Sequence, residues 1–258
     1  MKTKKKMIVL RAPNIDFRRI HPMILVMGKR RLTQGKVSLY FHDVISWLKS
    51  AQLSLISYRS HIDKLKDQKF IDELNRGERD KYEYVEMATY YLENAVIRLS
   101  AIRDKLAITA LVYYLHPDNL GVHTFEIKGC HKCGNKECSI SLTEKNCNFG
   151  VLMNFLRQQN ATDSLFKKFQ QIENDEDIKW LISQRNSILH RISQYRWSGL
   201  GIFPQGLEIS YEDGGEKCTF NLGSPKQTLD KEIPKIETAY NKLVEFVEEL
   251  EEILFPIT

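Results

Sequence analysis

A stretch of regularly spaced apolar residues, from Asp80 to His116, most strongly limits how this chain of 258 residues can fold. Its apolar positions recur at intervals of three, four or seven, which is the period of one face of an α-helix. They are Val85, Leu92, Val96, Leu99, Leu106 and Leu111. Pro117, followed by Asp118 and Asn119, ends the pattern with residues that break helices. The stretch therefore predicts one long helix.

A second long helical pattern precedes this one, from Val37 to Asn75, and breaks near Arg76 and Gly77. Its apolar positions are Val44, Trp47, Leu48, Leu55, Leu65 and Leu74. Two long helices that are joined by a short turn imply an antiparallel hairpin.

Four shorter segments also have a helical pattern. They are 150–158, 163–172, 175–197 and 234–254. Asn174 or Asp175 can cap the third segment, and two acidic residues follow in its first turn, where the helix dipole favours anions. The apolar stripe of the last segment, from Ile236 to Leu254, is interpreted as core rather than as the seam of a partner helix.

An alternating pattern near the end of the chain predicts a β-hairpin. Apolar and polar residues alternate in 207–211 and 217–222, on either side of Asp213, Gly214 and Gly215. The segment 121–148 has no long period and is interpreted as a loop or small insert. The predicted fold class is therefore mainly α: an antiparallel helical bundle with a cysteine-containing insert at 121–148 and one appended β-hairpin at 207–222.

The positive charge of the chain is concentrated at its N-terminus. The formal net charge is +5, from 38 Lys and Arg against 33 Asp and Glu. Segment 1–36 holds eleven Lys and Arg against one acid, so it carries +10, and the helical domain 37–258 carries −5. Such a block either contacts nucleic-acid phosphates or only keeps an exposed arm solvated. Its candidate nucleic-acid-binding residues are Arg18, Arg19, Lys29, Arg30 and Arg31.

Neither a membrane span nor a secretion signal is predicted. No apolar run approaches the roughly 18 residues of a spanning helix. The apolar run from Met7 to Leu10 is too short for a signal peptide. A cytoplasmic location without a membrane partner is therefore expected.

The segment 175–197 has an arginine on its apolar stripe. Arg185 falls seven residues after Ile178, where a charge is costly unless it is paired or open to a cleft. His190 follows Asn186 by four residues, so these two share a face. A guanidinium can grip a phosphate and an imidazole can move a proton, which suffices to cleave RNA without metal through its own 2′-OH. The alternative is a structural arginine paired with a carboxylate and an ordinary histidine.

The run Arg185-Asn186-Ser187-Ile188-Leu189-His190 resembles the R-N-x-x-x-H form of the R-x4-6-H motif of the HEPN superfamily, the higher eukaryote and prokaryote nucleotide-binding domains. Its place on a late helix, after two long antiparallel helices, is similar too. The helix 91–107 also resembles a branch of bacterial HEPN proteins typified by an all-helical clostridial protein. The resemblance covers roughly 37–197 without the insert.

The resemblance implies a metal-independent endoribonuclease in which Arg185 and His190 are catalytic and Asn186 supports them. It implies a homodimer that brings two motifs together across a cleft, in a toxin or defence setting with an antitoxin or another protein as partner. Some family members only bind, so the alternative is a non-catalytic module for a nucleotide, RNA or protein. No cofactor is expected for catalysis.

Two carboxylates on the long helix 80–116 are candidates to support the motif. Glu93, Ser100 and Asp104 are seven and four residues apart, so they lie along one line of the helix. Glu93 or Asp104 can pair with Arg185 or tune His190. The alternative is a plain solvated face.

Four cysteines of the insert form the order C-x2-C-x4-C-x8-C. They are Cys130, Cys133, Cys138 and Cys147. Thiolates at this spacing suit a structural zinc ion, although the second pair lacks the usual close spacing. The alternatives are free or redox-active thiols and disulfides, which a cytoplasmic location disfavours. A zinc-stabilised scaffold without phosphate chemistry is the third functional hypothesis.

Overall fold

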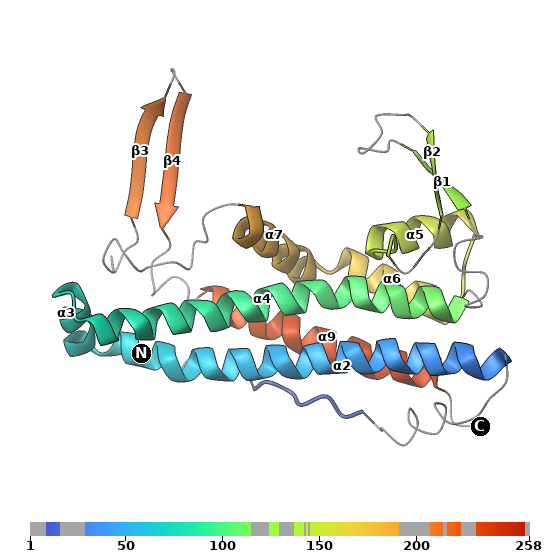
Figure 1. Ribbon diagram of the computed structural model, residues 1–258, viewed down its shortest axis with the longest axis horizontal. Coiled ribbons are helices and arrows are strands. Elements are labelled where there is room, and N and C mark those ends of the chain that lie inside the picture. The colour runs from blue at the N-terminus through green and yellow to red at the C-terminus, as the bar shows by residue number, and fades with distance from the viewer. Residues whose placement is uncertain are drawn as a thin grey trace, which may run out of the picture. The chain divides into compact units, whose positions relative to one another are not determined.

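The protein is mainly α-helical, which confirms the predicted fold class at this coarse level (Figure 1). The computed structural model describes residues 9–15, 29–114, 124–128, 137–141, 143, 145–190, 207–213, 216–222 and 231–255. The end of the predicted helix 175–197, from residue 191, lies outside them.

Two long helices, α2 (Lys29–Ile62) and α4 (Arg79–Tyr114), form the predicted antiparallel hairpin. Asn94 Nδ2 donates a hydrogen bond to Ser54 Oγ over 3.1 Å. Tyr84 Oη donates to the carbonyl of Ser60 over 3.2 Å. Later residues of α4 thus contact earlier residues of α2, which is the order that antiparallel helices require.

The first helix differs from the prediction at both ends. It begins at Lys29 rather than at Val37, so the end of the basic segment 1–36 is helical. It also ends at Ile62 rather than continuing to Asn75. A 3₁₀ turn and a separate short helix follow, namely η2 (Asp63–Lys66) and α3 (Gln68–Asn75). The prediction of one helix over 37–75 was therefore wrong.

Asp67 separates η2 from α3. Its backbone is extended, with φ −84° and ψ 117°, and its carboxylate accepts a hydrogen bond from Lys69 N over 3.0 Å. This is the geometry of an N-cap, which satisfies an amide that the first turn of α3 leaves without a helical partner. The apolar period runs on through the break, so it did not reveal the cap.

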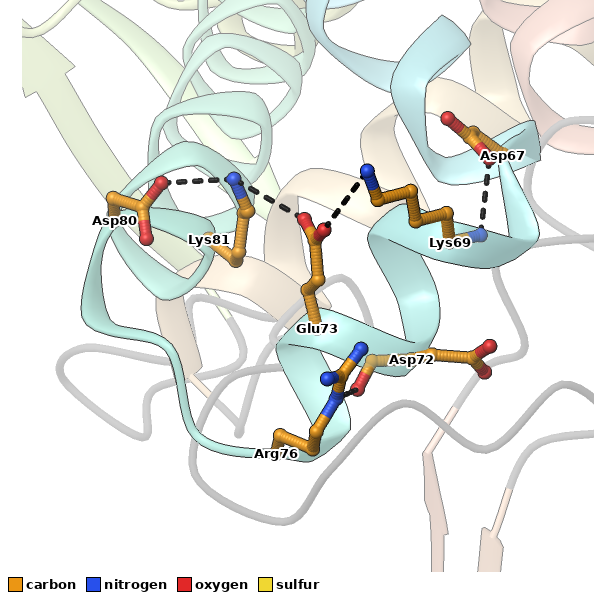
Figure 2. A network of polar contacts seen from close by, with 7 residues as sticks. All are labelled: Asp67, Lys69, Asp72, Glu73, Arg76, Asp80 and Lys81. Atoms are coloured by element: carbon orange, nitrogen blue, oxygen red, sulfur yellow. Dashed lines mark hydrogen bonds and ion pairs between the residues drawn. The ribbon is translucent and has the colours of Figure 1, made fainter.

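A polar network holds the turn between α3 and α4 (Figure 2). Lys81 Nζ lies 2.9 Å from Asp80 Oδ2 and 3.4 Å from Glu73 Oε2. Lys69 Nζ lies 3.8 Å from the other oxygen of Glu73. Because Glu73 is on α3 and Lys81 on α4, the network links the two helices across the turn.

The end of α3 is a Schellman motif centred on Gly77. Gly77 N donates to Leu74 O over 3.0 Å, and Glu78 N donates to Glu73 O over 3.4 Å. Gly77 has a positive φ of 87°, a conformation that glycine adopts without steric cost. The predicted break near Arg76 and Gly77 is confirmed.

We expect Gly77→Ala to lower the free energy of unfolding by about 1 kcal/mol, because a residue with a Cβ is strained at this φ. An added Cβ would meet nothing within 4 Å, so the cost arises from the backbone alone. Gly77→Asn should cost less, since asparagine tolerates the left-handed conformation better. Urea denaturation measures all three proteins, and an alanine variant as stable as the wild type would contradict the prediction.

The remaining helices lie close to the predicted segments. They are α5 (Phe149–Gln158), α6 (Ser164–Asn174), α7 (Glu176–His190) and α9 (Ile233–Leu254). Asn148 caps α5 by accepting from Val151 N over 3.0 Å, and Asp163 caps α6 by accepting from Phe166 N over 2.7 Å. No helix in the described part of the chain combines the length and apolar character that crossing a membrane requires.

Two antiparallel strand pairs accompany the helices. β3 (Leu207–Asp213) pairs with β4 (Glu216–Leu222) over the range where the sequence predicts a hairpin. β1 (Thr124–Lys128) pairs with β2 (Glu137–Ser141) in the segment that was interpreted as a loop or small insert. The register of β1 and β2 sets Phe125 opposite Ile140 and Ile127 opposite Cys138. Each of these strands has only five residues, which is too short for the alternation to stand out in the sequence.

The chain divides into two compact units. The first unit comprises Met1–Ala12, Lys49–Ser100 and Glu176–Leu243, and the second comprises Pro13–Leu48, Ala101–Asp175 and Val244–Thr258. Helices α2, α4 and α9 contribute residues to both units.

Each unit has a core of apolar side chains from several helices. Buried residues of the first unit include Leu55, Tyr58, Leu74, Leu92, Leu99, Leu181, Ile236 and Tyr240. Those of the second include Phe41, Leu48, Leu106, Leu152, Phe169, Val247 and Leu250. The apolar stripe of α9 is buried within the chain, which confirms its interpretation as core.

Candidate functional site

Helix α7 carries three of the predicted site residues and packs against α9 within the first unit. Lys242 Nζ lies 2.6 Å from Asp177 Oδ2, and Lys235 Nζ lies 4.7 Å from the centre of the Trp180 ring. These contacts move towards the start of α9 as α7 advances, so the two helices run antiparallel. Arg185 lies further along α7 than these contacts, towards the side where α9 begins.

The apolar stripe of α7 is buried up to the turn that holds Arg185. Ile178 is 4% exposed and Leu181 is 0% exposed. Arg185, which continues this stripe, is half-buried, and Asn186 beside it is exposed. The arginine therefore sits at the edge of the core.

His190 is the last residue of α7. Because the helix is continuous from Asn186 to His190, these residues lie one turn apart on the same side. The His190 side chain is outside the described part of the structure. The backbone thus brings the three motif residues together on the last two turns of α7.

The two candidate carboxylates of α4 belong to different units. Glu93 is half-buried in the first unit, which also contains α7. Asp104 is in the second unit, where its Oδ1 accepts a hydrogen bond from Phe149 N over 3.0 Å. Asp104 therefore helps to hold the start of α5, a structural role that the sequence did not predict. Pairing of Glu93 or Asp104 with Arg185 stays a prediction.

The candidate nucleic-acid-binding residues near the N-terminus are only partly described. Arg18 and Arg19 lie outside the described residues. Lys29, Arg30 and Arg31 form the first turn of α2, and their side chains also lie outside the description. Their contact with nucleic acid stays a prediction.

The four predicted metal ligands are described to different extents. Cys130 and Cys133 lie outside the described residues, and Cys138 is placed on β2 by its backbone alone. Cys147 is buried just before α5, and its thiol lies 3.8 Å from the carbonyl oxygen of Ala107 on α4. Among the residues with described side chains, no three His, Cys, Asp or Glu are grouped as metal ligands would be.

The surroundings of Cys147 favour its neutral thiol. Burial, with a smaller contribution from the carboxylate of Asp104, raises the pKa of the thiol to about 12. The thiol of Cys147 thus packs against α4 in its neutral form, and its role as a zinc ligand stays a prediction.

We expect the raised pKa of Cys147 to make the fold less stable at alkaline pH. The thiol ionises near pH 9 in the unfolded chain but near 12 in the folded one, so unfolding releases a proton above pH 9 and becomes easier. Between pH 8 and 10 the free energy of unfolding should fall by about 1.4 kcal/mol more in the wild type than in Cys147→Ala. Urea denaturation at the two values measures this difference, and parallel losses in both proteins would contradict it.

A partly buried ion pair is among the polar features that the sequence did not reveal. Arg59 Nε on α2 lies 2.5 Å from Glu237 Oε1 on α9, and the Glu237 side chain is only 4% exposed. Glu237 follows the buried Ile233 by four residues and precedes the buried Tyr240 by three. A charge on an apolar stripe, the signal that identified Arg185, could therefore have identified Glu237 as well.

An aromatic cluster joins α2 and α4 in the first unit. The His61 ring lies 4.5 Å from the Tyr84 ring and 5.3 Å from the Tyr91 ring, measured between centroids. His61 Nδ1 is 2.7 Å from the carbonyl of Ser57, and Lys64 Nζ lies 4.3 Å from the centre of the Tyr84 ring. His61 thus contributes to helix packing.

The chain was compared with known proteins at three levels. It matches no protein-family model, and no curated protein or solved structure proved similar to it. The assignment of a function therefore rests on the residues and geometry of the chain itself.

Proposed function

We propose that this protein is a metal-independent endoribonuclease of the HEPN type, with its site on the last two turns of α7. Arg185 binds the scissile phosphate, and His190 acts as general acid or base. Asn186 orients His190 or contacts the RNA. The substrate supplies its own 2′-OH as nucleophile, so the cleaved strand ends in a 2′,3′-cyclic phosphate.

The observation that carries the proposal is the placement of the motif at the edge of a packed core. Ile178 and Leu181 anchor α7, whereas Arg185 is half-buried and Asn186 is exposed. A half-buried guanidinium at the edge of a core is a position that a phosphate can reach, and it can bind the phosphate with two parallel hydrogen bonds. The order of two long antiparallel helices followed by the motif helix supports the same family.

The different roles of Arg185, His190 and Asn186 follow from the chemistry of their side chains. A guanidinium stays charged at all physiological pH values and can form two parallel hydrogen bonds to a phosphate. An imidazole exchanges protons near neutral pH. The reaction needs such an exchange twice, because a proton must leave the 2′-OH and another must reach the departing 5′-oxygen. A carboxamide one turn before it can fix the imidazole by a hydrogen bond.

Cleavage of a broad panel of RNAs in excess chelator tests the proposal. Arg185→Ala and His190→Ala should each slow cleavage at least about a hundredfold. Lys179→Ala, an exposed cation on the same helix, and His42→Ala, an exposed histidine on α2, should cleave like the wild type. An inactive wild type, or unchanged cleavage in both motif variants, would refute the nuclease assignment.

The second candidate is a non-catalytic HEPN module in which the same residues bind RNA, a nucleotide or a protein partner. The exposed Asn186 fits this second candidate as well as it fits the nuclease, because a carboxamide beside a guanidinium can bind a phosphate without cleaving the strand. This candidate would be identified if the wild type bound RNA without cleaving it and Arg185→Ala no longer bound RNA.

Three further parts of the proposal come from the family resemblance and from the cysteine spacing. They are action as a homodimer, a cytoplasmic toxin or defence role with an antitoxin or other protein partner, and a structural zinc held by cysteines of segment 121–148. The mass of the particle in solution tests the first. Metal analysis of protein purified without added zinc tests the third, and less than about half an equivalent would favour free thiols.

A further inference from the structure

The segment 9–15, which is neither helix nor strand, is held through its main chain. Asn241 Nδ2 on α9 donates a hydrogen bond to Val9 O over 2.9 Å, and Asn241 Oδ1 accepts one from Arg11 N over 3.0 Å. Tyr240 Oη donates to Arg11 O over 2.8 Å. Gln52 Nε2 on α2 donates to the same carbonyl over 3.3 Å. Four side-chain hydrogen bonds therefore reach three main-chain atoms of this segment within the first unit.

These contacts have the pattern of strand pairing. In an extended chain, the carbonyl of one residue and the amide two residues later point to the same side. The carboxamide of Asn241 bonds to such a pair and thus replaces the N–H and C=O of one residue in a neighbouring strand. Tyr240 and Gln52 bond to the next main-chain oxygen on that side. Helix side chains here do what a sheet edge does when it binds an extended peptide.

Most side chains of Val9–Ala12 are exposed, and Leu10 is half-buried. Val9 is 79% exposed, and Arg11 and Ala12 are exposed as well. Tyr240, in contrast, is 0% exposed, so its ring is fixed in the core while its hydroxyl reaches the segment. The receiving groups are therefore positioned by the fold, and the hydrogen bonds that they form go to the backbone of the segment.

A contact of the same kind continues in the second unit. Asn14 N donates a hydrogen bond to Glu248 Oε1 on α9 over 2.8 Å. Ile15 is the buried residue of the segment, with 8% exposure. Pro13, which has no amide hydrogen to donate, lies between the bonded amides of Arg11 and Asn14.

We propose that Gln52, Tyr240 and Asn241 form a binding site for an extended polypeptide, and that Val9–Ala12 is its ligand, supplied by the chain itself. The site recognises a carbonyl and an amide two residues apart on one side of an extended backbone. The entropy lost when the segment becomes ordered offsets much of the free energy that the hydrogen bonds contribute. Once the segment is severed from the chain, it therefore exchanges with a free peptide of the same sequence. This site is separate from the motif on α7.

The decisive experiment keeps the whole chain but cuts it once. A protease recognition sequence placed within 16–28 allows cleavage after folding, and binding of a fluorescent peptide with the sequence of 7–15 is followed by anisotropy. The peptide should bind the cut protein and not the uncut one, whose own segment fills the site. Asn241→Leu should weaken binding about tenfold or more, because two hydrogen bonds are lost. Asn154→Leu, an exposed asparagine on α5, is the matched control and should bind like the wild type.

Two altered peptides distinguish main-chain from side-chain recognition. A peptide with Arg11→Ala should bind within about threefold of the original, whereas one methylated on the amide nitrogen of residue 11 should bind about tenfold or more weakly. Absence of binding to the cut protein, or equal binding of the methylated peptide, would overturn the proposal.

Hydrogen exchange in the uncut chain provides an independent measurement, which also serves if the cut protein does not stay folded. The Arg11 amide should exchange about tenfold or more faster in Asn241→Leu than in Asn154→Leu. Amides in the middle of α9 should exchange equally in both. Equal exchange of the Arg11 amide in the two variants would also overturn the proposal.

Discussion

Phe169→Ala is expected to lower the free energy of unfolding by about 3–5 kcal/mol, the largest effect of any single substitution predicted for this chain. Phe169 is 0% exposed on α6 and lies at the centre of an aromatic group in the second unit. Its ring centroid is 5.8 Å from that of Phe149 on α5 and 5.8 Å from that of Phe246 on α9. Truncation removes the apolar area and leaves a cavity between three helices.

Two variants of α6 separate this cavity effect from a general loss of helix stability. Phe169→Leu fills much of the space and should cost clearly less than the alanine variant. Gln171→Ala, at an exposed position of α6, should stay within about 0.5 kcal/mol of the wild type. Urea denaturation gives all three values. A similar loss in Phe169→Ala and Gln171→Ala would show that Phe169 does not belong to the core.

The second large effect is expected from Arg59→Met, at about 3 kcal/mol. The substitution keeps the aliphatic stem but leaves the carboxylate of Glu237, whose side chain is 4% exposed, without the guanidinium 2.5 Å away. A buried charge that loses its partner is costly, because the interior does not replace the lost hydration. Denaturant unfolding at neutral pH measures the difference.

A double variant tests whether the lost partner is the cause. Arg59→Met combined with Glu237→Met removes both charges and should recover most of the stability. Lys179→Met is the control, because Lys179 and Glu176 form a pair with 49% and 83% exposed side chains, and such pairs contribute little. If the double variant were as unstable as Arg59→Met, the loss would come from packing rather than from charge.

The long helices were predictable because their apolar period is local information. Val85, Leu92 and Leu99 mark α4 within one stretch of chain, and all three are buried. The break after Ile62 was not visible in the same way, since Leu65 and Leu74 keep the period across it. Asp67, a residue type that favours N-caps, was the available signal for that break.

Contacts between distant parts of the chain could not be predicted from spacing. The bond from Arg11 N to Asn241 joins residues 230 positions apart, and it involves a main-chain atom, which leaves no trace in the sequence. Asp104 accepts from Phe149 N, 45 positions away, for the same reason.

The candidate site was partly predictable. The spacing from Ile178 placed Arg185 on the apolar stripe of α7, where the structure has it, and the helix extends through His190 as expected. The spacing did not show that Arg185 would lie at the edge of the core, because the ends of a buried face depend on neighbouring helices. Nor did it show that Asp104 would be engaged at α5 in the other unit.

The way in which the N-terminal segment is bound also affects how its sequence can evolve. Because the hydrogen bonds of Gln52, Tyr240 and Asn241 go to main-chain atoms of the segment, a change of the Val9 or Arg11 side chain that keeps the amide leaves these bonds intact. Proline at position 11 is the exception, because it lacks the amide hydrogen that Asn241 accepts. The groups that hold this backbone come from the helices, so a substitution of Gln52, Tyr240 or Asn241 removes hydrogen bonds that no change of the Val9 side chain can restore.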